Sequence, residues 1–184
     1  AVAQLNRGDP YGYIDKSGEF VIEPMFYSAT DFQNGYAHVH YRTDSGLFWG
    51  YIDKAGDFVI PPKYCGAAGY SEGLFSVLLE CSDSETRFGF IDINENIVIN
   101  PEYQDVKPFS EGLAAVEVAD PNNPDQSKWG YINKEGEIVI EPQYFEVGPF
   151  INEIAEVRYL GGLIFPRLKI GYINTDGKYI WKPS

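Results

Sequence analysis

The sequence is short of positive charge. It has 14 lysine and arginine residues against 27 aspartate and glutamate residues, which gives a formal net charge of −13. A protein that binds a phosphate backbone needs a basic surface. Nucleic acid is therefore excluded as a partner, and an anionic membrane surface is disfavoured. The excess of acid suits a solubilising charge, a basic protein partner or a neutral ligand.

Metal-ligating residues are also scarce. The chain has two cysteines, Cys65 and Cys81, and two histidines, His38 and His40. There is no CxxC pair or Cys/His cluster, so a zinc site is not expected. The two histidines share one face of an extended strand, but no third ligand accompanies them. We therefore predict no metal and no cofactor, and the sequence leaves open whether the cysteines form a disulfide.

Long apolar runs, helical periodicity and catalytic motifs are missing too. No run approaches the roughly 18 residues of a membrane helix, so no membrane insertion is expected. Apolar residues do not recur with a helical period. No Ser-His-Asp set, metal signature or phosphate loop is found, so we predict no catalytic residues and no enzyme. The chain begins at Ala1 without Met, as a processed protein or a fragment would.

The sequence contains five copies of one repeat unit. The key glycine recurs at Gly12, Gly50, Gly89, Gly130 and Gly171, so that the period is 38, 39, 41 and 41 residues. Periods of this length are typical of folds in which copies of one unit stack. We predict a single repeat domain over residues 1–184, with the last unit completed by, or equivalent to, residues 1–10. The units lie near 11–48, 49–87, 88–128, 129–169 and 170–184.

Each unit is predicted to hold three short antiparallel strands, or four if the connection after the proline pairs as well. In the copy that starts at Trp49, residues 49–53 alternate as a strand does, and residues 53–56 have the Asp-x-x-Gly chemistry of a hairpin turn. Residues 58–60 are rich in strand formers. Pro62 is expected to end that strand, because proline donates no ladder hydrogen bond. A third strand covers residues 73–77, so the predicted fold class is all-β.

The turns allow two sharper predictions. Asp15, Asp53 and Asp92 lack the spacing of a calcium loop, so we expect them to cap their turns. Glu95 stands where the other copies have the turn glycine. A glutamate resists positive φ, so we expect a neighbouring asparagine to take the left-handed position, with a shifted strand register.

The ends of the chain leave two arrangements open. Ala1-Val2 align with Ala115-Val116, the end of a third strand, and the chain closes with the first two strands of a fifth unit. A closed, propeller-like ring could join these pieces into one unit. An open β-array fits equally well.

The repeated residues resemble the WG-repeat family. The pattern Trp-Gly-Tyr-Ile-Asp/Asn-x-x-Gly, then Val-Ile, Pro and Gly-Leu-Ala-x-Val, stands in the copies from Trp49 and Trp129 and covers almost the whole chain. The resemblance implies a bacterial repeat module whose signature is structural, with no shared catalytic residues. It favours an exported protein, although the residues themselves do not determine the compartment.

Positions that vary between copies are the candidates for binding. On the third strands, the face opposite the recurring valine carries His38, His40, Glu156 and Arg158. The loops that lead to the next unit also vary, and in repeat folds such loops often lie on the binding side. The loop candidates are Asp120, Asn122, Asn123 and Asp125 in a polar loop, and Leu163, Ile164 and Phe165 in an apolar one. The apolar loop is either a patch for a partner or a cover over the end of the array.

A constant scaffold with variable surfaces favours a non-catalytic interaction module that binds a protein partner through its variable loops. A carbohydrate- or peptidoglycan-binding domain is the first alternative, since acidic, aromatic-rich β-repeats suit neutral sugars. Trp49 and Trp129 could stack on sugar rings, but their framework position favours packing. An architectural segment of a larger bacterial protein is the second alternative.

Overall fold

A computed structural model describes residues 1–79, 87–120, 123–161 and 167–182, and in residues 124, 125 and 161 the backbone alone. These residues form strands and turns, so the prediction of an all-β fold is confirmed. The described ranges hold no helical segment that could span a lipid bilayer.

The described strands form five antiparallel sheets, and in each sheet the strands follow one another in chain order. Sheet 1 contains β1 (Val2–Ala3), β2 (Tyr11–Ile14) and β3 (Phe20–Phe26). Sheet 2 contains β4 (Ser28–Ala29), β5 (Ala37–Thr43), β6 (Gly46–Ile52) and β7 (Phe58–Tyr64). Sheet 3 contains β8 (Gly66–Ser71), β9 (Leu74–Leu78), β10 (Phe88–Ile91) and β11 (Ile97–Tyr103). Sheet 4 contains β12 (Asp105–Val106), β13 (Ala114–Asp120), β14 (Asn123–Ile132) and β15 (Ile138–Tyr144). Sheet 5 contains β16 (Glu146–Val147), β17 (Ile154–Gly161), β18 (Arg167–Asn174) and β19 (Tyr179–Trp181).

The sheets do not coincide with the units read from the sequence period. The predicted third strand of one copy pairs with the first strand of the next copy, as β5 does with β6. The connection before it adds a short fourth strand, such as β4 beside β5. Four of the sheets therefore have four strands, and each sequence unit is shared between two neighbouring sheets.

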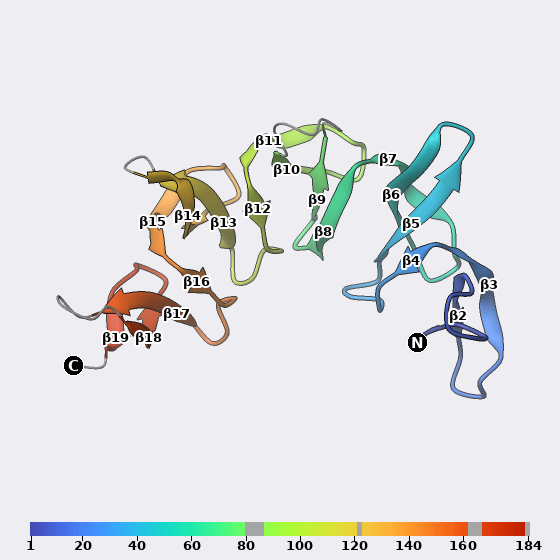
Figure 1. The fold of residues 1–184 in the computed structure, drawn as a ribbon, viewed down its shortest axis with the longest axis horizontal. Helices are drawn as coiled ribbons and strands as arrows, with labels where there is room; N and C mark the ends of the chain where they lie inside the picture. Colours follow the sequence, from blue (N-terminus) through green and yellow to red (C-terminus); the bar gives the residue numbers. More distant parts are fainter. Residues whose placement is uncertain (80–86, 121–122, 162–166, 183–184) are drawn as a thin grey trace.

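The five sheets follow one another along an open arc, with the two termini at its opposite ends (Figure 1). Of the two arrangements that the sequence left open, the structure has the open array. Strand β1 completes sheet 1 beside β2, where Ala3 pairs with Gly12 as Val116 pairs with Gly130 in sheet 4. The predicted alignment of Val2 with Val116 is therefore wrong by one residue.

Consecutive sheets pack face to face. We call the face that carries the aromatic residue after the motif glycine the front face, and the face that carries the recurring valine the back face. Between sheets 4 and 5, front residues pack on back residues in one buried cluster. The front residues are Trp129, Tyr131, Ile140 and Tyr144, and the back residues are Val147, Ala155, Val157 and Ile173. Equivalent clusters fill the other three interfaces, so the core is a series of layers between sheets.

In sheets 1, 2 and 4, the tyrosine after the motif glycine joins the sheet to its successor, while sheet 3 has Phe90 at this position. The Tyr131 hydroxyl donates a hydrogen bond to the Gly148 carbonyl in sheet 5 at 2.8 Å. Tyr13 does the same to Thr30 at 2.8 Å and Tyr51 to Gly69 at 3.0 Å. Burial raises the pKa of Tyr51 to about 12, which keeps the hydroxyl a donor. Each bond satisfies a carbonyl that sheet stacking removes from water.

The recurring glycine and proline belong to one feature, a register shift between the strands of each hairpin. In sheet 4, Trp129 pairs with Tyr144 and Tyr131 with Ile140, so β15 arches over Gly130. A Cβ on Gly130 would lie 2.5 Å from the Ile140 oxygen and 2.8 Å from the nitrogen of Pro142. The expectation that the proline ends its strand is wrong, because it sits in the arch, where the strand continues without its N–H.

The prediction for Glu95 is also wrong. Glu95 itself takes the left-handed conformation, with φ of 62°, and the hairpin keeps the same register as that of sheet 2. Its carboxylate accepts a hydrogen bond from the Tyr64 hydroxyl at 2.9 Å and pairs with Lys63 at 2.7 Å. These contacts with β7 offset the strain of a left-handed non-glycine residue, about 1 kcal/mol.

The acidic turn residues cap their turns as predicted. The Asp53 carboxylate accepts hydrogen bonds from the amides of Ala55 and Asp57 at 2.9 and 3.1 Å. Asp15 and Asp92 make the equivalent bonds. Hydrogen bonds to the charged form lower the pKa of Asp15 and of Asp92.

We predict that Tyr131→Phe lowers the free energy of unfolding by about 1 kcal/mol, because it leaves the Gly148 carbonyl without its donor. Chemical denaturation followed by circular dichroism measures this change. The matched control is Tyr172→Phe at the same position of sheet 5, for which we expect a change within about 0.5 kcal/mol. Equal losses in the two variants would contradict the assignment.

We predict that Gly130→Ala lowers the free energy of unfolding by about 3 kcal/mol, because the new methyl overlaps the backbone of β15. Gly148→Ala is the control, since a Cβ there has no heavy atom nearer than 3.7 Å. Thermal unfolding of both variants checks the difference, and a tolerated Gly130→Ala would rule out the arch as the reason for the glycine.

Candidate functional site at the C-terminal face

Among the described residues, no sheet follows sheet 5 on its front face. Strand register places alternate side chains of β17 and β18 on this face, where Glu156 pairs with Tyr172, Arg158 with Ile170 and Leu160 with Leu168. Trp181 of β19 pairs with Tyr172 and completes it. We call this surface the C-terminal face. It consists of Ile154, Glu156, Arg158, Leu160, Leu168, Ile170, Tyr172 and Trp181.

The same positions are buried one sheet earlier. Trp129, Tyr131 and Ile140 on the front face of sheet 4 are 7%, 1% and 4% exposed. Their counterparts by register are Ile170, Tyr172 and Trp181, which are 41%, 37% and 53% exposed. The difference arises because sheet 5 covers sheet 4 and no described sheet covers sheet 5. The C-terminal face is thus an interior surface of the repeat that is left in contact with solvent.

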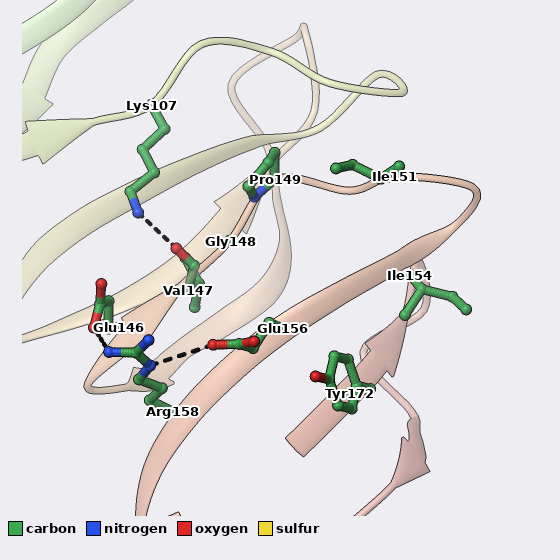
Figure 2. Close-up of a pocket in the computed structure, with 10 residues that line it drawn as sticks. All are labelled: Lys107, Glu146, Val147, Gly148, Pro149, Ile151, Ile154, Glu156, Arg158 and Tyr172. Carbon is green, nitrogen blue, oxygen red and sulfur yellow. Dashed lines mark hydrogen bonds and ion pairs between the residues drawn. The ribbon is translucent and has the colours of Figure 1, made fainter. Parts of the chain in front are cut away.

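A hollow of about 580 Å³ lies on this face beside Tyr172. Figure 2 shows Pro149 and Ile151 along its upper side, with Ile154 and Tyr172 opposite them. The wall is therefore mainly apolar near the aromatic ring. The Tyr172 hydroxyl lies on this wall. In the described ranges it makes no hydrogen bond to a following sheet.

Charged side chains line the other side of the hollow. Arg158 pairs with Glu146 at 2.7 Å and with Glu156 at 3.3 Å. Lys107 donates a hydrogen bond to the Val147 carbonyl at 2.6 Å and also lies 5.1 Å from the centre of the Trp129 ring. Half-exposed ion pairs contribute little to stability. Their effect here is to hold one guanidinium between two carboxylates at the edge of an apolar surface (Figure 2).

Of the residues predicted from the sequence, Glu156 and Arg158 lie on the C-terminal face. His38 and His40 lie on the front face of sheet 2 and do not join them. The His40 ring stacks on Trp49 with centroids 4.7 Å apart, and His38 lies 5.5 Å from Trp49 and 5.8 Å from Tyr51. Burial lowers the pKa of His38 to about 4.

Of the loop candidates, Asp120 and Asn123 lie in sheet 4 and not on the C-terminal face. Asp120 ends β13 and pairs with Asn123 at the start of β14. Asp125 has its backbone in β14, but its side chain lies outside the described atoms. The candidates Asn122, Leu163, Ile164 and Phe165 lie outside the described residues.

The structure also bears on the sequence predictions for Trp129 and for the two cysteines. Trp129 is buried, as its framework position predicted. Cys65 is disulfide-bonded, while Cys81 lies outside the described residues. No group of three or more histidine, cysteine or acidic side chains that could hold a metal ion occurs within the described part of the chain.

Sequence reasoning missed Ile170, Tyr172 and Trp181 because it treated their positions as framework. The signal was present in the repeat count. In an open array the last unit has the same framework residues as the others but no successor to bury them. The position of a copy in the array, and not its residue types, makes these side chains accessible.

Comparison with known proteins identifies the repeat. The family profile described as WG containing repeat matches residues 11–39, 49–80, 88–120 and 129–163. No curated protein and no solved structure matches the sequence.

We predict that His38 titrates with a midpoint of about 4, because burial disfavours the imidazolium. The unfolded chain, with an ordinary histidine pKa near 6.5, binds more protons between the two values. His38 therefore makes the fold less stable as pH falls from about 6.5 to about 4. NMR of the imidazole Cε1 proton measures the midpoint directly.

The stability change is isolated by subtracting the pH profile of His38→Gln, since carboxylates titrate in the same range. A His38 midpoint near 6.5 would show that its ring is in contact with water and not buried against Trp49 and Tyr51.

Proposed function

The chain belongs to the WG-repeat family, and we propose that it is a non-catalytic β-repeat interaction module that binds a protein partner on its C-terminal face. The observation that carries this proposal is the exposure of Ile170, Tyr172 and Trp181 at positions that are buried in sheet 4. A partner that covered the face would do what the next sheet does elsewhere in the array.

The energetics favour a partner. Burying one large apolar side chain stabilises by about 1.5–3 kcal/mol, and several such side chains lie together here. Contiguous apolar surface with a polar rim is typical of interaction sites. The rim is supplied by Arg158 with Glu146 and Glu156.

A non-catalytic function is supported by what the candidate groups do. Both histidines pack against Trp49, and the acidic turn residues bond to their own backbone amides. These groups are committed to structure. Binding through the variable loops remains a prediction alongside the C-terminal face, because most of those loop residues lie outside the described ranges.

One observation favours glycan binding as a second function. Trp181 and Tyr172 lie together on the C-terminal face with ring centroids 6.1 Å apart, and exposed aromatic rings can stack on sugars. The aliphatic side chains beside them, Ile154, Ile170 and Leu168, suit a protein surface better.

We predict that Tyr172→Arg and Ile170→Glu each abolish partner capture, because each places a charge in the apolar centre of the face. The intact chain and both variants would be used as baits for lysate and culture medium of the source cells, with quantitative mass spectrometry. Both positions are exposed, so we expect melting temperatures within about 3 °C of the parent chain.

Ile93→Glu, at an exposed apolar residue of the sheet 3 turn, is the matched control and should retain the partner. A partner lost equally with the control, or retained by both face variants, would contradict binding at the C-terminal face. Protection of Trp181 from acrylamide quenching by a soluble glycan, with no protein lost in either face variant, would favour the second function.

A further inference from the structure

We propose that the element of the partner that enters the hollow beside Tyr172 is an aromatic β-hairpin on a different protein, of the kind that begins sheets 2 to 5 of this chain. Its features are an extended segment with a free carbonyl, an aromatic side chain shortly after it, and a two-residue left-handed turn. This inference rests on the proposed function and names the binding chemistry of the same face.

The internal interfaces show what a front face accepts. At the interface of sheets 4 and 5, the Tyr131 hydroxyl holds the Gly148 carbonyl at 2.8 Å. The Phe150 ring, two residues later, lies 4.8 Å from the Tyr131 ring. Sheet 1 receives sheet 2 in the same way, with Tyr13 bonded to Thr30 and 4.7 Å from the Phe32 ring.

The hollow occupies the corresponding place on sheet 5. Leu113, Tyr131 and Phe150 belong to one buried cluster between sheets 4 and 5. The register counterparts of Leu113 and Tyr131 are Ile154 and Tyr172, and both line the hollow. An aromatic ring placed there would meet Ile154 and Tyr172 where Phe150 meets the cluster of Leu113 and Tyr131, with Glu156 in the place of Ala115. The Tyr172 hydroxyl would then supply the donor for the carbonyl.

The turn of the hairpin also has a docking place. Asn152 and Glu153 have φ of 51° and 63°, and the Glu111 carboxylate accepts hydrogen bonds from both of their amides at 2.7 Å. Glu72 accepts the amide of Gly112 in the same way at 3.2 Å. The tight turns of sheets 3 and 4 thus present carboxylate oxygens to the amides of the next turn. In sheet 2 the Asn34 side-chain amide instead donates to the Tyr70 carbonyl. On sheet 5, Asn152 and Glu153 are the residues placed to do so.

A second copy of this chain cannot supply the hairpin. Phe109 and Phe150 are 2% and 1% exposed in their own interfaces, and Phe32 and Tyr70 pack against residues of the preceding and the same sheet. In the described residues, sheet 1 contains β1, β2 and β3 and no such hairpin. We assign the occupant to a different polypeptide that carries the pattern.

The test uses a synthetic hairpin as its probe. A peptide with the sequence of residues 105–117, closed by a disulfide between added terminal cysteines, is titrated into the intact ¹⁵N-labelled chain. We expect saturable shifts of the Trp181 indole N–H and of the Tyr172 and Ile154 amides. A peptide with Phe109→Ala is the matched control. It should bind at least tenfold more weakly, because no aromatic ring fills the hollow beside Tyr172.

Two protein variants sharpen the result. Tyr172→Phe keeps the ring but removes the hydroxyl, so the affinity for the probe should fall about fivefold, the effect of one neutral hydrogen bond. Tyr172→Arg should abolish the shifts. Equal binding of the Phe and Ala peptides, or shifts at sheets other than sheet 5, would overturn the proposal.

A second measurement tests the proposal in the case that the isolated peptide does not fold into a hairpin. It uses an extended chain in which residues 144–184 are added again after Ser184. The added copy keeps the strand register, because Trp181 occupies the position of Ile140. The added copy carries Phe in place of its own tryptophan, so that the original Trp181 reports. We expect Trp181 to become protected from acrylamide, and less so when the added copy also carries Phe150→Ala.

An unprotected Trp181 in this extended chain would overturn the hairpin proposal whatever the peptide does. The proposed function is judged separately by the capture experiment. A partner lost with Tyr172→Arg but not displaced by the hairpin peptide would uphold the proposed function and refute the hairpin. Self-association through sheet 5, seen as a dimer in analytical ultracentrifugation that Tyr172→Arg dissociates, would refute it too.

Discussion

Every sheet in this protein depends on its neighbours to remove its two apolar faces from water. A sheet of three or four short strands is too small to form a core alone, and the buried clusters lie between sheets and not within them. The Tyr131 hydroxyl adds direction, since it bonds to the backbone of the following sheet only. The array therefore has a polarity, and the sheet without a successor must differ from the rest in exposure.

The local sequence rules serve this stacking. Gly130 and Pro142 let one strand arch over the other, which places Tyr131 and Ile140 side by side on the front face. Tight turns bond to one another from sheet to sheet. Glu95 shows that the rule tolerates exceptions when a contact with the previous sheet replaces the glycine. The same physics that builds the scaffold leaves the apolar side chains of the C-terminal face exposed.

The repeat period, the all-β class and the capped turns were predictable from the sequence because they depend on residues within one unit. The pairing of one copy's third strand with the next copy's first strand was not, because the sequence period has no natural starting point. Glu95 was misjudged because its compensation comes from Tyr64, 31 residues earlier. The candidate site was found only in part. Glu156 and Arg158 vary between copies, whereas Tyr172 is a framework residue whose exposure depends on its place at the end of the array.

The central claim is that burial at a front face depends on the presence of a following sheet. Hydroxyl-radical footprinting of the isolated chain, read residue by residue by mass spectrometry, tests it most directly. The account predicts strong oxidation of Tyr172 and Trp181 on the front face of sheet 5. It predicts protection of Tyr131 and Trp129, the tyrosine and tryptophan on the front face of sheet 4. Equal protection of the four side chains would show that the C-terminal face is already covered in the free protein, and would contradict the account.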